Sequence, residues 1–280
     1  MSTTRPILAL HGISNLKSNL TRQQAADELA RSWQPRLAAG YRAAGLSHVT
    51  PPEIVAAYYA DLLNPMSQGA EPALDQLTPE ERRFMWCWLT ELGVPAGDAQ
   101  GPLTAPLRQG VDWLARRRGL GADLLARVMT AILREVYVYL TRPALRQRVR
   151  DVVAEAIVKH QPRVLVAHSL GSVVGYETLH ATGADVELLV TLGSPLALPG
   201  AVFEALDPEP VDGQGKRPSG VRRWVNLADP GDLVAVPKRL GDRFPVDLHD
   251  EAYLGVVDFH TLGGYLACGV TAAAIMPYAN

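Results

Sequence analysis

The sequence predicts an α/β protein with a mostly parallel central sheet, helices on both faces of that sheet and one long helical insertion. Three observations support this class: short apolar runs bounded by turn residues, helical patterns between those runs, and one internal segment where the alternation stops. At 280 residues and 48% hydrophobic, the chain is long enough to bury one sizeable core. We therefore expect one domain that carries an insertion.

Five short runs of β-branched or aliphatic residues predict buried strands, because they are apolar on both faces. They cover residues 6–10, 54–59, 163–167, 187–192 and 223–227. The clearest helical patterns lie at residues 147–160, before the third run, and at 172–180, after it. Strands that alternate with helices are typical of a parallel sheet covered on both faces.

Between residues 64 and 145 this alternation gives way to helical patterning broken by glycine and proline. The expected organisation is thus a core of residues 1–63 and 146–280 with a helical insertion at 64–145. The strongest helical stretch of the insertion carries apolar residues at Leu124, Leu125, Val128, Met129, Ile132, Leu133, Val136, Tyr137 and Leu140. This stripe either packs on the core or lines an apolar substrate pocket, and the sequence leaves both interpretations open.

Composition argues against several classes of partner and location. A formal net charge of −2 provides no positive field that would gather nucleic acid or anionic lipid. Cys87 and Cys268 lie in apolar stretches away from metal-ligand spacings, which predicts buried free thiols. The first residues lack a signal-peptide pattern, and no apolar run reaches about 18 residues. We expect a soluble, cytoplasmic protein without stable membrane insertion.

The clearest chemical motif is at residues 164–175, where an apolar strand, a small-x-Ser-x-Gly turn and a helical pattern follow one another. In a nucleophile elbow the serine occupies such a sharp turn, and the residues two before and two after it must be small. Ala167 and Gly171 fill these positions around Ser169. Ser169 is therefore the candidate nucleophile, and the alternative is a serine that only caps the following helix.

A serine nucleophile needs a base that is itself oriented by a carboxylate, and after such an elbow the chain order is serine, acid, histidine. His260 follows in this order and is the candidate base, in preference to His249, which lies among acidic residues. Asp229 and Asp232 both lie in the turn after the fifth apolar run. We favour Asp232, because the Leu-Val that follows it would hold its backbone rigidly, and take Asp229 as the second choice.

Acyl transfer also requires backbone N–H donors for the developing oxyanion. Leu170, directly after the candidate nucleophile, is expected to supply one donor. Ile13 is expected to supply the other, because the first strand ends in a His-Gly pair that allows a tight turn. The residues beside these motifs, His11, Gly12, His168 and Ser194, are candidates for the substrate pocket.

The segments LALHGI, VAHSLGS, TLGSP, WVNLADPGDLVAVP and DFH resemble the landmarks of the α/β-hydrolase superfamily, especially its lipases and esterases. The resemblance covers roughly residues 5–60 and 150–270. It implies the α/β-hydrolase fold, with Ser169 as nucleophile, Asp232 as acid, His260 as base, and Ile13 and Leu170 as oxyanion donors. Alanine replaces the usual first glycine of the elbow, and the insertion precedes the nucleophile strand. The second departure leaves the substrate class open.

The expected function is that of a serine hydrolase that cleaves a small-molecule or lipid-like acyl ester through an acyl-enzyme. This chemistry requires no metal and no organic cofactor. Amidase, thioesterase or acyltransferase activity on the same triad stays an alternative, because pocket shape decides the leaving group and the acceptor. A catalytically inactive hydrolase-like binding protein is a further alternative. The sequence indicates no particular oligomeric state.

Overall fold

The computed structural model describes residues 5–63, 73–95, 105–255 and 260–278. The expected start of the insertion at Asn64, two of its chain-breaking residues, Gly101 and Pro102, and the Asp258-Phe259 pair before the candidate base lie outside these ranges.

A six-stranded parallel sheet forms the centre of the molecule. Its strands are β1 (Ile7–Leu10), β2 (Ile54–Ala57), β3 (Val164–His168), β4 (Val186–Leu192), β5 (Val221–Ala228) and β6 (Leu248–Glu251), in the order β2-β1-β3-β4-β5-β6. The chain moves outward from β1 to β2 and then returns to β3 on the other side of β1, so the direction of winding reverses between β1 and β3. The predicted α/β class with a parallel sheet is confirmed.

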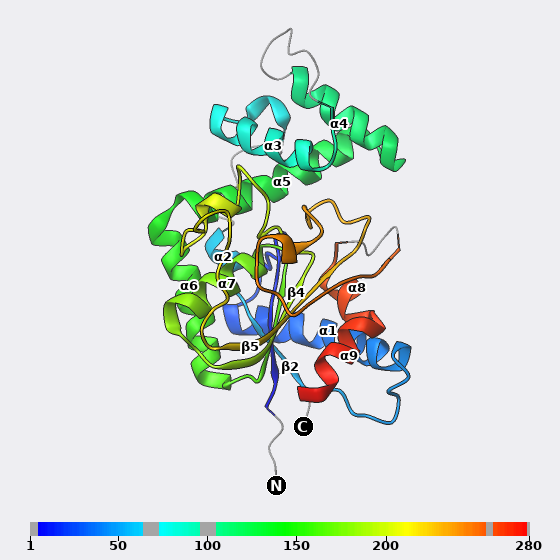
Figure 1. Cartoon of the computed structure of the whole chain (residues 1–280), viewed down its shortest axis with the longest axis vertical. Coiled ribbons are helices and arrows are strands. Elements are labelled where there is room, and N and C mark those ends of the chain that lie inside the picture. The colour runs from blue at the N-terminus through cyan, green and yellow to red at the C-terminus, as the bar shows by residue number, and fades with distance from the viewer. Residues whose placement is uncertain (1–4, 64–72, 96–104, 256–259, 279–280) are drawn as a thin grey trace.

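Helices cover both faces of this sheet (Figure 1). One layer consists of α1 (Arg22–Ala43), α8 (Leu262–Ala267) and α9 (Gly269–Ile275), and the other of α6 (Pro143–His160) and α7 (Leu170–Thr182). Alternate strand residues enter the two layers, since Ile7 and Ala9 pack in the core on the α1 side while Leu8 and Leu10 pack in the core on the α6 side. β1 is therefore buried on both faces, as its apolar sequence predicts.

Helix α1 was not predicted from the sequence. It begins at a capping box in which the Thr21 hydroxyl accepts from the Gln24 N–H and the Gln24 side chain returns to the Thr21 N–H. Buried residues recur at every fourth position of this helix, at Ala25, Leu29, Trp33, Leu37 and Tyr41. Alanines between the large residues and Pro35 inside the helix weaken this pattern in the sequence.

Beyond the carboxyl ends of the strands lie α3 (Pro79–Glu91), α4 (Ala105–Arg118) and α5 (Ala122–Thr141), while a short α2 (Ala60–Leu63) follows β2 (Figure 1). The predicted apolar stripe of α5 is divided: most of it is buried, but the Leu124 and Val128 side chains are 60% and 45% exposed. The Trp88 indole N–H of α3 donates to the Leu233 carbonyl at 2.6 Å. Helix α3 thereby contacts the loop that carries the candidate acid.

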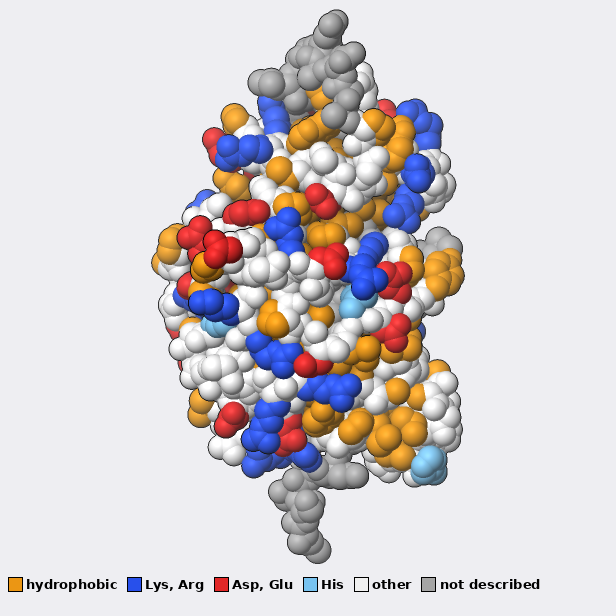
Figure 2. Space-filling model, in the orientation of Figure 1, with side chains coloured by type: hydrophobic (Ala, Val, Ile, Leu, Met, Phe, Trp, Pro, Cys, Tyr) orange, Lys and Arg blue, Asp and Glu red, His pale blue; other side chains and the backbone are white. Residues whose placement is uncertain are grey.

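On the face drawn in Figure 2, basic and acidic side chains are interspersed. Both cysteines are free but partly exposed, so the prediction that they are buried is wrong. Cys87 lies in α3 beside Gly200, and Cys268 lies in the break between α8 and α9. Over the described ranges, every helix is too short or too polar to cross a membrane.

Candidate active site

Ser169 occupies the sharp turn between β3 and α7, with a φ of 53° and a ψ of −128° that a non-glycine residue rarely adopts. Its N–H donates to the Leu192 carbonyl at 3.0 Å, and its carbonyl accepts the Ser172 hydroxyl at 2.6 Å. A Cβ at position 171 would lie 2.7 Å from the His11 carbonyl oxygen. The glycine two residues after Ser169 is therefore required by the close approach of β1.

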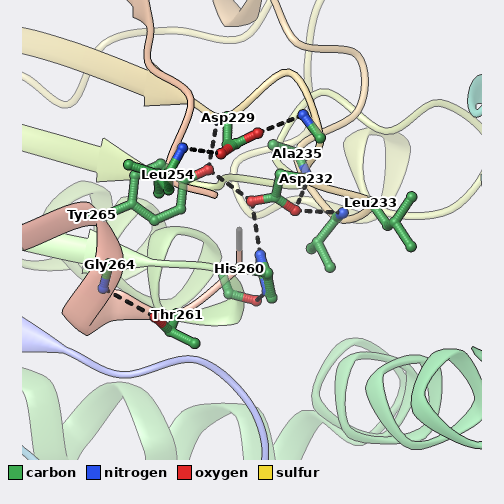
Figure 3. A network of polar contacts seen from close by, with 12 residues as sticks. Asp229, Asp232, Leu233, Ala235, Leu254, His260, Thr261, Gly264 and Tyr265 are labelled. Carbon is green, nitrogen blue, oxygen red and sulfur yellow. Dashed lines mark hydrogen bonds and ion pairs between the residues drawn. The ribbon is translucent and has the colours of Figure 1, made fainter. Parts of the chain in front are cut away.

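Three side chains that are distant in the sequence form one hydrogen-bonded chain. His260 Nε2 lies 3.0 Å from Ser169 Oγ. His260 Nδ1 lies 2.8 Å from Asp232 Oδ2 (Figure 3). Because a carboxylate only accepts, Nδ1 carries the proton and the lone pair of Nε2 faces the serine hydroxyl. The arrangement allows the imidazole to take the hydroxyl proton of Ser169.

Asp232 follows β5 and is completely buried. Its Oδ1 accepts the Val234 N–H at 2.7 Å. Its Oδ2 accepts the Tyr265 hydroxyl, also at 2.7 Å (Figure 3). Burial by itself raises the pKa of this carboxyl, but the charge and hydrogen bond of His260, together with these two donors, outweigh burial and lower the pKa to about 2. Asp232 is thus held as a carboxylate at neutral pH.

Asp229 is also buried but faces away from His260. Its Oδ1 accepts the Gly231 N–H at 2.5 Å. Its Oδ2 accepts the Leu254 N–H, also at 2.5 Å (Figure 3). The structure therefore brings Asp232 to the imidazole, while Asp229 shapes the surrounding loops. Tyr265 connects the two, since its hydroxyl accepts the Asp229 N–H at 2.9 Å and donates to Asp232.

The loop after β1 presents its backbone to the same site. The Gly12 carbonyl accepts from His11 Nδ1 at 2.6 Å and from Asn15 Nδ2 at 3.1 Å. In a trans peptide the C=O and the N–H point in opposite directions, so the Ile13 N–H points away from these two side chains. Neither this N–H nor that of Leu170 donates to another residue in the described ranges. Both donors are available to an acceptor that enters the site.

His11 fixes this loop as a neutral imidazole. Its Nε2 accepts the Tyr59 N–H at 3.2 Å, so its proton resides on Nδ1 and is donated to Gly12. Burial lowers the pKa of His11 to about 4, which keeps the ring uncharged at neutral pH. His11 was predicted as a pocket residue; it borders the cavity described below, and both of its ring nitrogens are hydrogen-bonded within the protein.

Glu135 of α5, which was not predicted as a site residue, holds the same loop. Its two carboxylate oxygens lie 3.1 and 3.3 Å from the Ser14 nitrogen, and the residue is 7% exposed. Burial raises the pKa of Glu135 to about 7, even though the Ser14 N–H opposes the shift. A charged residue inside the apolar stripe of α5 is the sequence signal that could have identified it.

This pKa predicts a pH-dependent stability that Glu135→Gln should remove. Between its ordinary value of 4.5 and about 7, the folded protein holds more protons than the unfolded chain, so stability falls as pH rises through this window. Above pH 7 the buried carboxylate costs about 3 kcal/mol. Glutamine keeps an acceptor for Ser14, so the variant should unfold at higher urea at pH 8 and at equal urea below pH 4.5. The exposed change Glu209→Gln is the control, and equal stability of wild type and Glu135→Gln at pH 8 would contradict the predicted cost of the buried charge.

A cavity of about 390 Å³ adjoins the hydrogen-bonded chain. It is lined by the 11–15 loop, His168, residues 260–263, Trp33, and Val128 and Ile132 of α5. Ser169 itself is fully buried, so a substrate must displace part of this wall to reach the hydroxyl. The predicted pocket residues Gly12 and His168 border the cavity, and His168 Nε2 lacks a hydrogen-bond partner among the described residues.

Ser194 is not among the residues that line this cavity. Its hydroxyl lies 2.7 Å from that of Ser172 and accepts the Leu196 N–H at 3.2 Å. Ser194 therefore supports the turn from behind through Ser172, although the sequence suggested it as a pocket residue.

Gly12→Ala should disturb the donor loop without removing any polar group. A Cβ at this position would lie 2.7 Å from Ser169 Cβ and 3.2 Å from its Oγ, so the 12–13 peptide must shift. If the Ile13 N–H stabilises an oxyanion, the kcat for an ester should fall by roughly a hundred- to a thousandfold. The control is Gly121→Ala, where no atom lies within 4 Å of the added carbon. Unchanged kcat in Gly12→Ala would argue against the Ile13 donor.

In the described part of the chain, no group of three or more His, Cys, Asp or Glu side chains is arranged to hold a metal ion. No protein-family model matches the chain, and neither a curated protein nor a solved structure matches it.

Proposed function

We propose that the protein is a serine hydrolase of the α/β-hydrolase type that cleaves carboxylic esters through an acyl-enzyme on Ser169. The observation that carries this proposal is the continuous hydrogen-bonded chain from Ser169 Oγ through His260 to Asp232. The N–H groups of Ile13 and Leu170 beside the serine support it, because neither donates to another residue that the structure describes. Together they form the set of groups that acyl transfer requires.

The position of these groups in the sheet supports the same proposal. Ser169 follows β3 and the Gly12–Ile13 peptide follows β1, the two strands between which the winding direction reverses. Open α/β sheets bind their ligands at this point, outside the carboxyl ends of the strands. The chain order Ser169, Asp232, His260 is also that of α/β-hydrolases.

In the proposed reaction Ser169 Oγ attacks the ester carbonyl while His260 Nε2 takes the hydroxyl proton. The N–H groups of Ile13 and Leu170 stabilise the oxyanion of the tetrahedral intermediate. His260 then gives its proton to the leaving alcohol, and the acyl group remains on Ser169. Water, deprotonated by the same imidazole, attacks the acyl-enzyme, and the acid leaves as His260 gives that proton back to Ser169 Oγ. The buried Asp232 carboxylate stabilises the charged ring in both steps.

The walls of the neighbouring cavity favour an apolar acyl group. Trp33, Val128, Ile132 and Leu262 contribute apolar side chains to it. We therefore propose a small-molecule or lipid-like acyl ester as substrate. The same groups also perform thioester and amide cleavage, and matched ester, thioester and amide substrates with one acyl group distinguish these reactions.

A fluorophosphonate probe tests the proposal, because it phosphonylates only an activated serine. The wild-type protein is expected to gain one adduct, located at Ser169 by peptide mass analysis, and Ser169→Ala is expected to gain none. Ser32→Ala, on the exposed side of α1, is the matched control and should label as the wild type does. No adduct on the folded wild-type protein would instead favour an inactive, hydrolase-like binding protein.

A further inference from the structure

The outer edge of β2 is open. β2 pairs with β1 on one side, and no strand of the described chain pairs with its other side. Helices α1 and α6 flank this edge from opposite faces of the sheet, and the three elements line a groove of about 790 Å³. This groove lies at the opposite edge of β1 from β3 and its serine, so its role is separate from that of the candidate active site.

The backbone of β2 can accept another strand. Adjacent residues of a strand direct their N–H and C=O groups to opposite sides. Since the Glu53 carbonyl accepts the Ile7 N–H of β1 at 2.8 Å, Val55 also faces β1, and Ile54 and Ala56 face outward. Ala56, in the middle of the open edge, therefore presents one donor and one acceptor to the groove.

A side-chain amide already occupies the start of this edge. Gln34 Oε1 accepts the Ile54 N–H at 2.9 Å, and Gln34 Nε2 donates to the Pro52 carbonyl at 3.0 Å. Within the described ranges, no side chain of α1 bonds Ala56 in the same way. An antiparallel strand centred on Ala56 would satisfy its two groups, because each Ala56 N–H would meet the Ala56 carbonyl of the other strand.

The charges on the two helices are arranged for a reversed copy of the same surface. On α1, Asp27 precedes Arg31 by one turn, and on α6, Glu155 precedes Lys159 by one turn; all four side chains are exposed and line the groove. None of them forms an ion pair with a described residue. A second copy in antiparallel orientation places acid opposite base on both helices, whereas a parallel copy places like charges together.

A single twofold axis can relate both the two copies of β2 and the two copies of α1. Gln34 lies level with the start of β2, where it bonds Ile54, and Arg22 pairs with Asp61 at 2.7 Å just beyond its end. The part of α1 between Asp27 and Arg31 therefore lies level with the middle of β2. Two small side chains that line the groove, Ala30 on α1 and Ala156 on α6, leave room for the facing helices.

We propose that two copies of the chain form a twofold-symmetric dimer in which β2 pairs antiparallel with β2 of the second copy. The two sheets then form one continuous sheet, and α1 and α6 each face their counterparts across the axis. The self-complementary order of Asp27 and Arg31, repeated by Glu155 and Lys159, identifies the partner as a second copy and not an unrelated peptide.

Sedimentation equilibrium of the full chain tests this dimer from about 1 to 100 µM, the range of affinities expected for small interfaces. Wild type is expected to reach twice the monomer mass of 30.3 kDa. Asp27→Arg and Arg31→Asp each place like charges opposite one another, and each should raise the dissociation constant at least about tenfold. Mixed one to one, the two variants should regain the dimer, because one copy is then basic at both positions and the other acidic.

Two controls distinguish pairing through this groove from nonspecific association and from misfolding of the variants. Arg148→Asp reverses an exposed charge of α6 outside the groove and should leave the dimer intact. Circular dichroism and thermal unfolding should show that both α1 variants are folded. A wild-type protein that stays monomeric throughout, or a dimer that neither α1 variant weakens, would overturn the proposal. So would a mixture of the two variants that stays monomeric.

Discussion

Replacing Ser169 with alanine is expected to lower the kcat for an activated ester by about a millionfold. The change removes the only atom of this residue that can attack a carbonyl, and His260 then has no hydroxyl proton to accept. The Ile13 and Leu170 N–H groups and the cavity remain, so the residual rate should still exceed that of the buffer. Initial rates on a nitrophenyl ester at saturating substrate measure the effect.

Two controls make this measurement specific to Ser169. Ser32→Ala should keep the wild-type kcat, and thermal unfolding should show that alanine is accepted at the positive φ of residue 169. A loss of less than about tenfold in a folded Ser169→Ala variant would mean that another group is the nucleophile, against the expectation for a triad that acts as a unit.

Replacing Asp232 with asparagine should lower kcat by about ten-thousandfold at neutral pH. An amide beside Nδ1 can donate its N–H, which favours the tautomer whose proton is on Nε2 and thereby blocks the acceptance of the Ser169 proton. It also removes the buried charge that stabilises the imidazolium of His260. The kcat of Asp232→Asn and wild type on the same ester, compared at pH 7, measures this loss.

Asp229→Asn is the matched control for this prediction. Both aspartates are fully buried in the same turn, and both lie within hydrogen-bond reach of Tyr265. Of the two, only Asp232 contacts His260. Asp229→Asn should therefore mainly lower the free energy of unfolding and have little effect on kcat. A larger loss of kcat in Asp229→Asn than in Asp232→Asn would transfer the acid role to Asp229.

Five of the six strands were predictable because they contain apolar runs, whereas β6 and helix α1 were not. β6 reads Leu-His-Asp-Glu and lies half exposed at the edge of the sheet, so no buried pattern marks it. Helix α1 buries alanine and glycine beside its large residues, which dilutes its apolar periodicity. Its capping box at Thr21 was a usable signal that the apolar pattern alone does not include.

Ser169, Asp232 and His260 could be predicted because the elbow is a short contiguous motif and because the order of serine, acid and histidine can be read along the chain. The groups that support them could not be found in this way. Glu135 reaches Ser14 across 121 positions, and Tyr265 reaches Asp232 across 33, so only the folded chain brings them together. The catalytic roles of Ser169, Asp232 and His260 stay predictions that the variants above test.

Helix α5 both walls the cavity, through Val128 and Ile132, and holds the donor loop, through Glu135 and Ser14. Residues 128, 132 and 135 lie on two successive turns of this one rigid helix. A change that enlarges the cavity by tilting α5 would also move the loop that carries the Ile13 N–H. Substrate selectivity and kcat should therefore change together during evolution. A smaller side chain on the cavity side of α5 would admit new substrates without moving this loop.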